Sequence, residues 1–345
     1  MNSSTPFVSR VAVLALLAGE RRESLPCFSG LINVTYPGLE RIGVNLSEVH
    51  ADPDNMALAA ATTYRLFGFQ SAVVPLDMCV EAEALGSQVD FRLETPQDEL
   101  PRVIAPLVDS STNLQIQRLS DLSKRARVSV VTEAIRILQK DVGDDIVIGA
   151  WVPGPFTLAT QLVDLMNLVM ETQTAPKDVG LVLDRLTDVL VEVALAYHAA
   201  GADFLTVHEM GGSPGFIGPA TFEKLVLPRL QRLIQELPSP CVLSVCGDTN
   251  RSIATMAESG ADALSVDQTN DLAHSREVLG TEAILIGNID PVGTLIHNDE
   301  TSIRSSVRHA IESGVDAIWP GCDLSPQVPG PSMRVMVDEC QRSRR

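Results

Sequence analysis

Short apolar runs alternate with longer amphipathic stretches along most of the chain. Clear examples of the runs are residues 202–208, 241–246 and 263–267. Runs of this length that are apolar throughout are typical of strands buried on both faces, as in a parallel sheet. Over the whole sequence, such strand candidates lie near residues 28, 74, 148, 205, 243, 264, 285 and 318.

The stretches between these runs repeat apolar residues at helical spacing, and many of them start at proline or end at glycine. Helices are predicted over residues 52–67, 154–170, 176–200, 219–237, 251–259, 273–279, 301–313 and 331–342. Eight strands that alternate with helices predict an α/β protein with a (β/α)8 TIM barrel fold. A doubly wound parallel sheet is the alternative. In both folds functional side chains gather at the carboxyl ends of the strands.

The length of 345 residues would fit two average domains or one barrel with an extension. We expect a single barrel domain over residues 1–345, with an N-terminal helical extension at residues 1–25. The apolar run at residues 11–17 is similar to a signal-peptide core, but charged residues 20–23 follow it without a small-residue cleavage pattern. We therefore interpret this run as an amphipathic first helix.

Charge and cysteine content narrow the possible partners and the cellular location. The net charge of -18 and the pI near 4.7 argue against nucleic acid as a partner, because no basic stripe is present to neutralise phosphates. Apolar runs are all shorter than the roughly 20 residues that span a bilayer, so we expect no membrane insertion. Six cysteines without a dense framework fit a reducing, cytoplasmic location, where thiols are metal ligands or buried apolar groups.

Polar side chains stand at the predicted strand ends, where a barrel would bring them to one mouth. They are Asp77, His208, Glu209, Ser244, Cys246, Asp267, Asn288, Asp290 and Cys322. Two cysteines held by rigid strands suit a soft metal such as zinc. Each residue also has a structural interpretation, since free cysteine is often a buried apolar group and aspartate often caps loops and helices.

Several collinear motifs connect the chain to a known family. They are Val80–Gly86, Gly154–Ala159, Val245–Gly247, Leu264–Asp267, Gly287–Pro291 and Pro320–Cys322. With these motifs the sequence resembles the uroporphyrinogen decarboxylase superfamily, and within it the methylcobalamin:coenzyme M methyltransferases. The resemblance extends from about Val11 to the last predicted helix.

The resemblance implies a zinc site, because the methyltransferase branch binds zinc through a His-x-Cys pair and a distant cysteine. Cys246 and Cys322 match the two cysteines, whereas Ser244 occupies the histidine position. Serine is a poor zinc ligand compared with imidazole, so another residue must complete the set. Asp267 and His208, on the neighbouring predicted strands, are the candidates.

The function implied is corrinoid-dependent methyl transfer from methylcobalamin, or from a corrinoid protein as partner, to a small-molecule thiol such as coenzyme M. Homocysteine or a folate are other acceptors that the resemblance allows. We assign catalytic roles to Asp77 and Glu209, and cofactor binding to Asn288 and Asp290.

Two alternatives stay open. The first is a decarboxylase in which Asp77 stabilises a protonated pyrrole. Asp77 matches the essential aspartate of those enzymes, but Gln161 and Cys322 stand at their tyrosine and histidine positions, and residues 24–30 lack their arginines. The second is a corrinoid-binding protein without catalytic activity.

Overall fold

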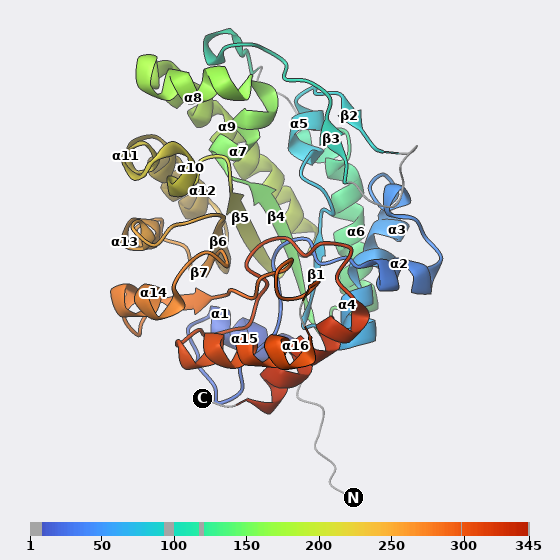
Figure 1. Cartoon of the computed structure of the whole chain (residues 1–345). Coiled ribbons are helices and arrows are strands. Elements are labelled where there is room, and N and C mark those ends of the chain that lie inside the picture. Colours follow the sequence, from blue (N-terminus) through green and yellow to red (C-terminus); the bar gives the residue numbers. More distant parts are fainter. Residues whose placement is uncertain (1–8, 93–99, 117–120, 298, 344–345) are drawn as a thin grey trace, which may run out of the picture.

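Short parallel strands lie at the centre of the molecule (Figure 1), and with two flanking segments they close into a ring. The computed structural model describes residues 9–92, 100–116, 121–297 and 299–343. Six of the segments form one parallel sheet in the order β1-β4-β5-β6-β7-β8. Their bounds are β1 Ser71–Val74, β4 Val147–Pro153, β5 Phe204–Glu209, β6 Cys241–Val245, β7 Ala263–Val266 and β8 Ile284–Ile286.

Two further segments close the ring through isolated parallel bridges. Ala317 pairs with Ile286 on β8, and Ile318 pairs with Cys27 on the other side. The backbone N–H of Gln70 donates to the Cys27 carbonyl at 2.9 Å. This bond joins the segment around Cys27 to the start of β1. All eight predicted strand positions therefore take part, and the predicted barrel is confirmed in place of the doubly wound sheet.

Helices surround the ring and connect its segments in sequence (Figure 1). Their bounds are α1 Ser9–Leu17, α2 Tyr36–Ile42, α3 Pro53–Ala60, α4 Thr62–Phe67, α5 Val80–Ala84, α6 Val128–Asp141, α7 Pro155–Leu162, α8 Leu165–Thr174, α9 Pro176–Ala200, α10 Pro214–Ile217, α11 Pro219–Thr221, α12 Leu227–Glu236, α13 Ile253–Ala257, α14 Leu272–Leu279, α15 Glu300–Glu312 and α16 Gly330–Arg342. A short antiparallel pair, β2 Val89–Asp90 and β3 Arg102–Val103, lies outside the ring. Among the described residues, no helix has the length and apolar character needed to cross a membrane.

Three predicted helices are interrupted in the structure. The helix predicted over 154–170 divides into α7 and α8, because Val163 leaves the helix to bridge Val108 and Asp164 caps the new start. The helix predicted over 219–237 contains a π turn at Phe222–Val226 just before Pro228. Proline cannot donate to the preceding turn and clashes with its carbonyl, so a wider turn relieves the conflict.

The third interruption separates α3 from α4 within the predicted helix 52–67. It lies at Ala61, where the Thr62 hydroxyl donates to the Ala59 carbonyl at 2.6 Å. Back-bonding of this kind competes with the helical backbone and bends it.

The first helix covers the amino-terminal ends of the barrel strands. Val13, Leu16 and Leu17 on α1 are buried in a cluster with the first inward-facing residues of the strands, including Phe204 and Val242. This end is therefore filled by apolar packing. Polar inward-facing residues lie at the opposite, carboxyl-terminal end.

Candidate metal centre

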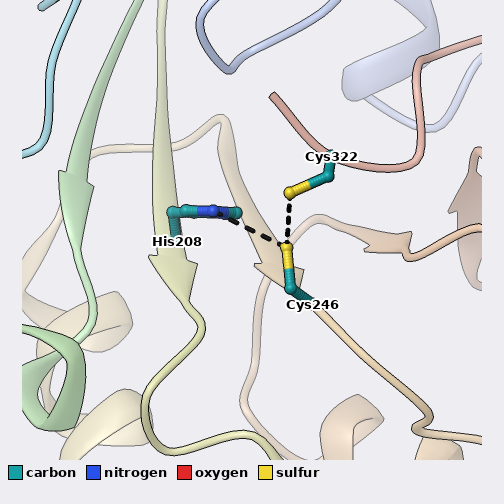
Figure 2. Close-up of side chains that lie close together, drawn as sticks. All are labelled: His208, Cys246 and Cys322. Carbon is teal, nitrogen blue, oxygen red and sulfur yellow. Dashed lines mark hydrogen bonds between the residues drawn. The ribbon is translucent and has the colours of Figure 1, made fainter. Parts of the chain in front are cut away.

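Neighbouring strands bring two predicted site residues to the carboxyl-terminal mouth of the barrel. His208 lies near the end of β5, and Cys246 directly follows β6. Cys322 arrives from the last segment of the ring, two residues after Pro320, which bridges Ile289. The three side chains come from segments far apart in the sequence and converge on one point (Figure 2).

Their donor atoms form a compact group, all within 4.8 Å of one another. The Cys246 sulfur lies 2.9 Å from the Cys322 sulfur and 3.7 Å from Nε2 of His208. His208 is fully buried, whereas the two cysteines are partly exposed at the mouth. Among the described residues this is the group of histidine, cysteine and carboxylate side chains that could hold a metal ion.

A hydrogen bond joins the two thiols. The pKa of Cys322 is lowered to about 5, because the Cys246 thiol donates to it, while burial acts in the opposite direction and His208 adds to the lowering. The same hydrogen bond, together with burial, raises the pKa of Cys246 well above its usual range. One thiolate is thus present near neutral pH, and thiolate is the form that binds metals.

The donor set fits zinc. Two sulfurs and one imidazole nitrogen around a tetrahedral zinc ion are separated by about 3.6 to 3.8 Å, given bonds of about 2.3 and 2.0 Å. The sulfur–nitrogen distance of 3.7 Å already matches, and the sulfur pair at 2.9 Å needs to open by less than about 1 Å. Cys246, Cys322 and His208 are therefore the residues that could hold the ion.

The strand pairing explains how His208 can stand in for a histidine at position 244. Ser244 on β6 pairs directly with His208 on β5. An imidazole on either strand at this level reaches the same part of the mouth. Asp267, the other candidate, is not in the group, and its carboxylate accepts bonds of 2.8 Å from both the backbone N–H and the hydroxyl of Thr269.

Glu209, which follows His208 on β5, points away from the candidate metal ligands and holds the loops around them. Its buried carboxylate accepts backbone hydrogen bonds from Phe156, Thr157 and Gly212 at 2.9 to 3.1 Å. The Thr157 hydroxyl also donates to it. Burial raises the pKa of Glu209 against these donors. The contacts join the start of α7 to the loop after β5.

Asp77 lies at the end of β1 in a fully buried ion pair. Arg127 donates to both of its oxygens, and Nδ1 of His50 lies 3.0 Å away. Burial acts to raise the pKa of Asp77, but His50 and the charge of Arg127 outweigh it and hold the pKa far below the usual range. The Asp77 carboxylate is therefore ionised and fully engaged within the protein.

The two residues predicted to bind the cofactor shape loops in the structure. Asn288 donates from its side-chain amide to the carbonyls of Asp267 and Asn270, both at 3.0 Å. Asp290 accepts from the backbone N–H groups of Val292 and Gly293 at 2.9 and 2.8 Å. These contacts order the rim next to β7 and β8.

The structure adds residues that the sequence analysis did not select. Thr157 lies inside the motif Gly154–Ala159, but the motif does not indicate its hydrogen bond to Glu209, which joins two distant segments. Asp323 places a carboxylate oxygen 3.8 Å from Nε2 of His208 and accepts from the Ile32 N–H at 3.0 Å. In the sequence, only its position directly after Cys322 indicates that Asp323 lies near the site.

Fold and site together define a parallel barrel protein with a thiolate–imidazole centre suited to a soft metal. The model of the uroporphyrinogen decarboxylase (URO-D) family matches residues 9–343. The chain belongs to this family.

Known relatives include both branches expected from the motifs. The methylcobamide:CoM methyltransferase MtaA of Methanosarcina barkeri is 30% identical over 341 residues, which cover 96% of this chain and 97% of that protein. The solved structure of a methyltransferase from Methanosarcina mazei has a TM-score of 0.91 at 28% identity and covers 97% of this chain and 99% of that one. A uroporphyrinogen decarboxylase of Pelobacter propionicus is 26% identical over 308 residues and covers 86% of each chain. The predicted likeness to the family and to its methyltransferases is confirmed.

Proposed function

We propose that this protein is a methyltransferase that moves a methyl group from methylcobalamin, or from a methylated corrinoid protein, to a thiol such as coenzyme M. The observation that carries the proposal is the group formed by His208, Cys246 and Cys322 at the barrel mouth. Its support is the match along nearly the whole chain to a methylcobamide:CoM methyltransferase. The thiolate ligands need a reducing compartment, which fits the cytoplasm.

Cys246, Cys322 and His208 would hold the zinc ion and leave a fourth tetrahedral position for the acceptor, as in other catalytic zinc sites. When bound, zinc keeps the acceptor thiol in its nucleophilic thiolate form near neutral pH. The acceptor sulfur forms a bond to the methyl carbon while the carbon–cobalt bond breaks, and both electrons of that bond remain on cobalt. The thiol proton is released.

The other predicted residues would hold the loops and the rim around the site in place. Glu209 would fix the loop after β5, and with it His208, through its bonds to Thr157 and Gly212. Asn288 and Asp290 would order the rim on which a flat corrinoid rests. Asp77 would anchor the loop after β1 through its ion pair with Arg127.

A porphyrinogen decarboxylase is supported less well. That reaction needs a carboxylate free to face the pyrrole that becomes protonated. Instead, both oxygens of Asp77 accept hydrogen bonds from Arg127, and Nδ1 of His50 lies 3.0 Å from one of them. Breaking a buried pair of this kind costs about 3–5 kcal/mol.

Demethylation of methylcobalamin, followed by its absorbance, tests the proposal across coenzyme M, homocysteine and a folate. We expect thiol-dependent demethylation that Cys246→Ser reduces by about 100-fold or more, with loss of zinc. Cys241→Ser on the same strand is the matched control and should keep both zinc and activity. Equal turnover in Cys246→Ser and wild type would contradict the proposal.

A further inference from the structure

Asp323 places a carboxylate beside the candidate metal ligands without being one of them. It directly follows Cys322, and its Oδ2 lies 3.8 Å from Nε2 of His208. The donor atoms of His208, Cys246 and Cys322 all lie within 4.8 Å of one another, and Asp323 is not in that group. Because the ligands of a tetrahedral zinc ion are only about 3.3 to 3.8 Å apart, Asp323 stands at the edge of the centre.

One oxygen of the Asp323 carboxylate is held by the backbone, and the other can accept from a ligand. Oδ1 accepts a hydrogen bond from the Ile32 N–H at 3.0 Å, which fixes the side chain. The ion-pair partner of Oδ2 in the described part of the chain is His208. Nε2 of His208 cannot serve a metal ion and Asp323 at the same time. With zinc bound, Oδ2 is therefore free to pair with a cation of a ligand, and the side chain is 21% exposed at the mouth.

The charge around the proposed metal position is negative. A zinc ion held by two thiolates and a neutral imidazole carries no net charge, so carboxylates determine the local field. The pKa of Cys246 is raised mainly by its hydrogen bond with Cys322, then by burial and by the charge of Cys322. The charges of Asp323 and Asp267 raise it further. Both carboxylates thus lie close enough to act on the candidate ligands.

No arginine or lysine in the described part of the chain forms an ion pair with Asp323. Arg127, which lies behind the end of β1, is buried and donates to Asp77 and Glu83 instead. An anionic group close to Asp323 would therefore meet a like charge without a cation to balance it. A cationic group in the same place would form a charge-assisted hydrogen bond to Oδ2.

We propose that the methyl acceptor is a small aminothiol, and that Asp323 selects it by pairing with its protonated amine. The inference rests on the proposed function and names the class of its acceptor. In 2-aminoethanethiol, two carbon atoms separate the amine from the sulfur, which keeps the cation near a sulfur placed beside Cys246 and Cys322. Coenzyme M has the same chain length but ends in a sulfonate. The amine itself takes no part in the methyl transfer.

The test is the dissociation constant of three thiols of equal chain length, measured by calorimetry on zinc-loaded protein at about pH 8, where the amine is protonated. The thiols are 2-aminoethanethiol with a cation, neutral 2-sulfanylethanol, and coenzyme M with an anion. Wild type should bind 2-aminoethanethiol more tightly than coenzyme M. Asp323→Asn keeps the oxygen that accepts from Ile32 and removes the charge. We expect it to weaken binding of 2-aminoethanethiol by about 5- to 20-fold and to change binding of 2-sulfanylethanol by less than about 2-fold.

The matched control is Asp109→Asn, which removes an exposed carboxylate from the segment that bridges Val163 at the end of α7. It should leave all three constants within about 2-fold of wild type. Because each thiol is compared between wild type and variant, the different acidities of the three thiols cancel.

Zinc content distinguishes selection of the acceptor from metal binding, and Asp323→Asn should retain as much zinc as wild type. Loss of zinc in Asp323→Asn would make Asp323 a metal ligand and overturn the inference. An equal loss of affinity for 2-aminoethanethiol and 2-sulfanylethanol, or tighter binding of coenzyme M than of 2-aminoethanethiol by wild type, would overturn it as well. Failure of the proposed function is a separate result, in which zinc-loaded wild type demethylates methylcobalamin with none of the three thiols.

Discussion

At the scale of single residues, the proposed metal centre depends on which strand carries the imidazole. His208 and Ser244 are paired across β5 and β6, so a histidine at either position points into the same region of the mouth. The two sulfurs stay where the family motif places them, and the nitrogen comes from the neighbouring strand. A serine at the histidine position of the motif is therefore compatible with an intact donor set.

This arrangement predicts that the imidazole can be moved between the strands. His208→Ala should weaken zinc binding by more than about 100-fold, because even loss of an outer-shell partner costs 10- to 100-fold. The double variant His208→Ala/Ser244→His should recover most of that affinity. Zinc affinity is measured by competition with a chromogenic chelator.

The control for the exchange is His208→Ala/Ser265→His, which places histidine on β7, where Ser265 pairs with Ser244. It should remain zinc-deficient, because the nitrogen would lie two strands away from the position that His208 occupies on β5. Full zinc binding by His208→Ala alone would show that the imidazole is not a ligand.

At the scale of elements, buried polar contacts join the strand ends to the surrounding helices. Arg127, at the start of α6, connects Asp77 after β1 with Glu83 on α5. Glu81, also on α5, is buried and lies 3.3 Å from the Tyr197 hydroxyl of α9. Its second oxygen has no hydrogen-bond partner among the described residues. A charged carboxylate is unfavourable in such a place.

Glu81 makes the stability of the fold depend on pH. Burial raises the pKa of Glu81 to about 8. The unfolded chain releases this proton at its ordinary pKa near 4.5, whereas the folded protein keeps it, so stability falls as pH rises from about 4.5 to about 8. Glu81→Gln should remove this dependence and be more stable than wild type at pH 8 by on the order of 1–4 kcal/mol.

Urea unfolding at pH 5 and pH 8 provides the measurement. Glu236→Gln, at the exposed end of α12, should follow the wild-type curve at both values. If Glu81→Gln and wild type lose the same stability between the two pH values, Glu81 is not the group responsible.

At the scale of the whole molecule, one end of the barrel is filled by apolar side chains and the other end carries the candidate site. Helix α1 fills the first, with Leu16 only 3% exposed against the inner faces of the strands. The second carries the candidate metal ligands and the Glu209 contacts. Tight packing at one end supports the ring of strands whose other ends hold the site.

Helix α1 should therefore contribute to global stability. Leu16→Ala leaves a cavity at the closed end of the barrel and should lower the free energy of unfolding by about 2–5 kcal/mol. Val11→Ala, on the same helix but 52% exposed, should change it by less than about 0.5 kcal/mol. Urea unfolding of both variants is the check, and equal stability would mean that α1 only rests on the barrel.

The sequence predicted the ring well because buried parallel strands are continuous apolar runs. It predicted that Cys246 and Cys322 come together at one end of the barrel, because both stand just after such runs. The breaks in the predicted helices were missed, since they depend on tertiary contacts such as the bridge from Val108 to Val163. The position of His208, rather than Asp267, beside the two cysteines and the hydrogen bond from Thr157 to Glu209 depend on register between distant segments. Such register leaves no signal along the chain.

The most direct test of the central claim is X-ray absorption at the zinc edge, recorded with and without a thiol acceptor. Without thiol we predict two sulfur neighbours at about 2.3 Å and an imidazole nitrogen at about 2.0 Å. Addition of the acceptor should raise the sulfur count from two to three. A count that stays at two in the presence of a thiol that is being methylated would contradict the account.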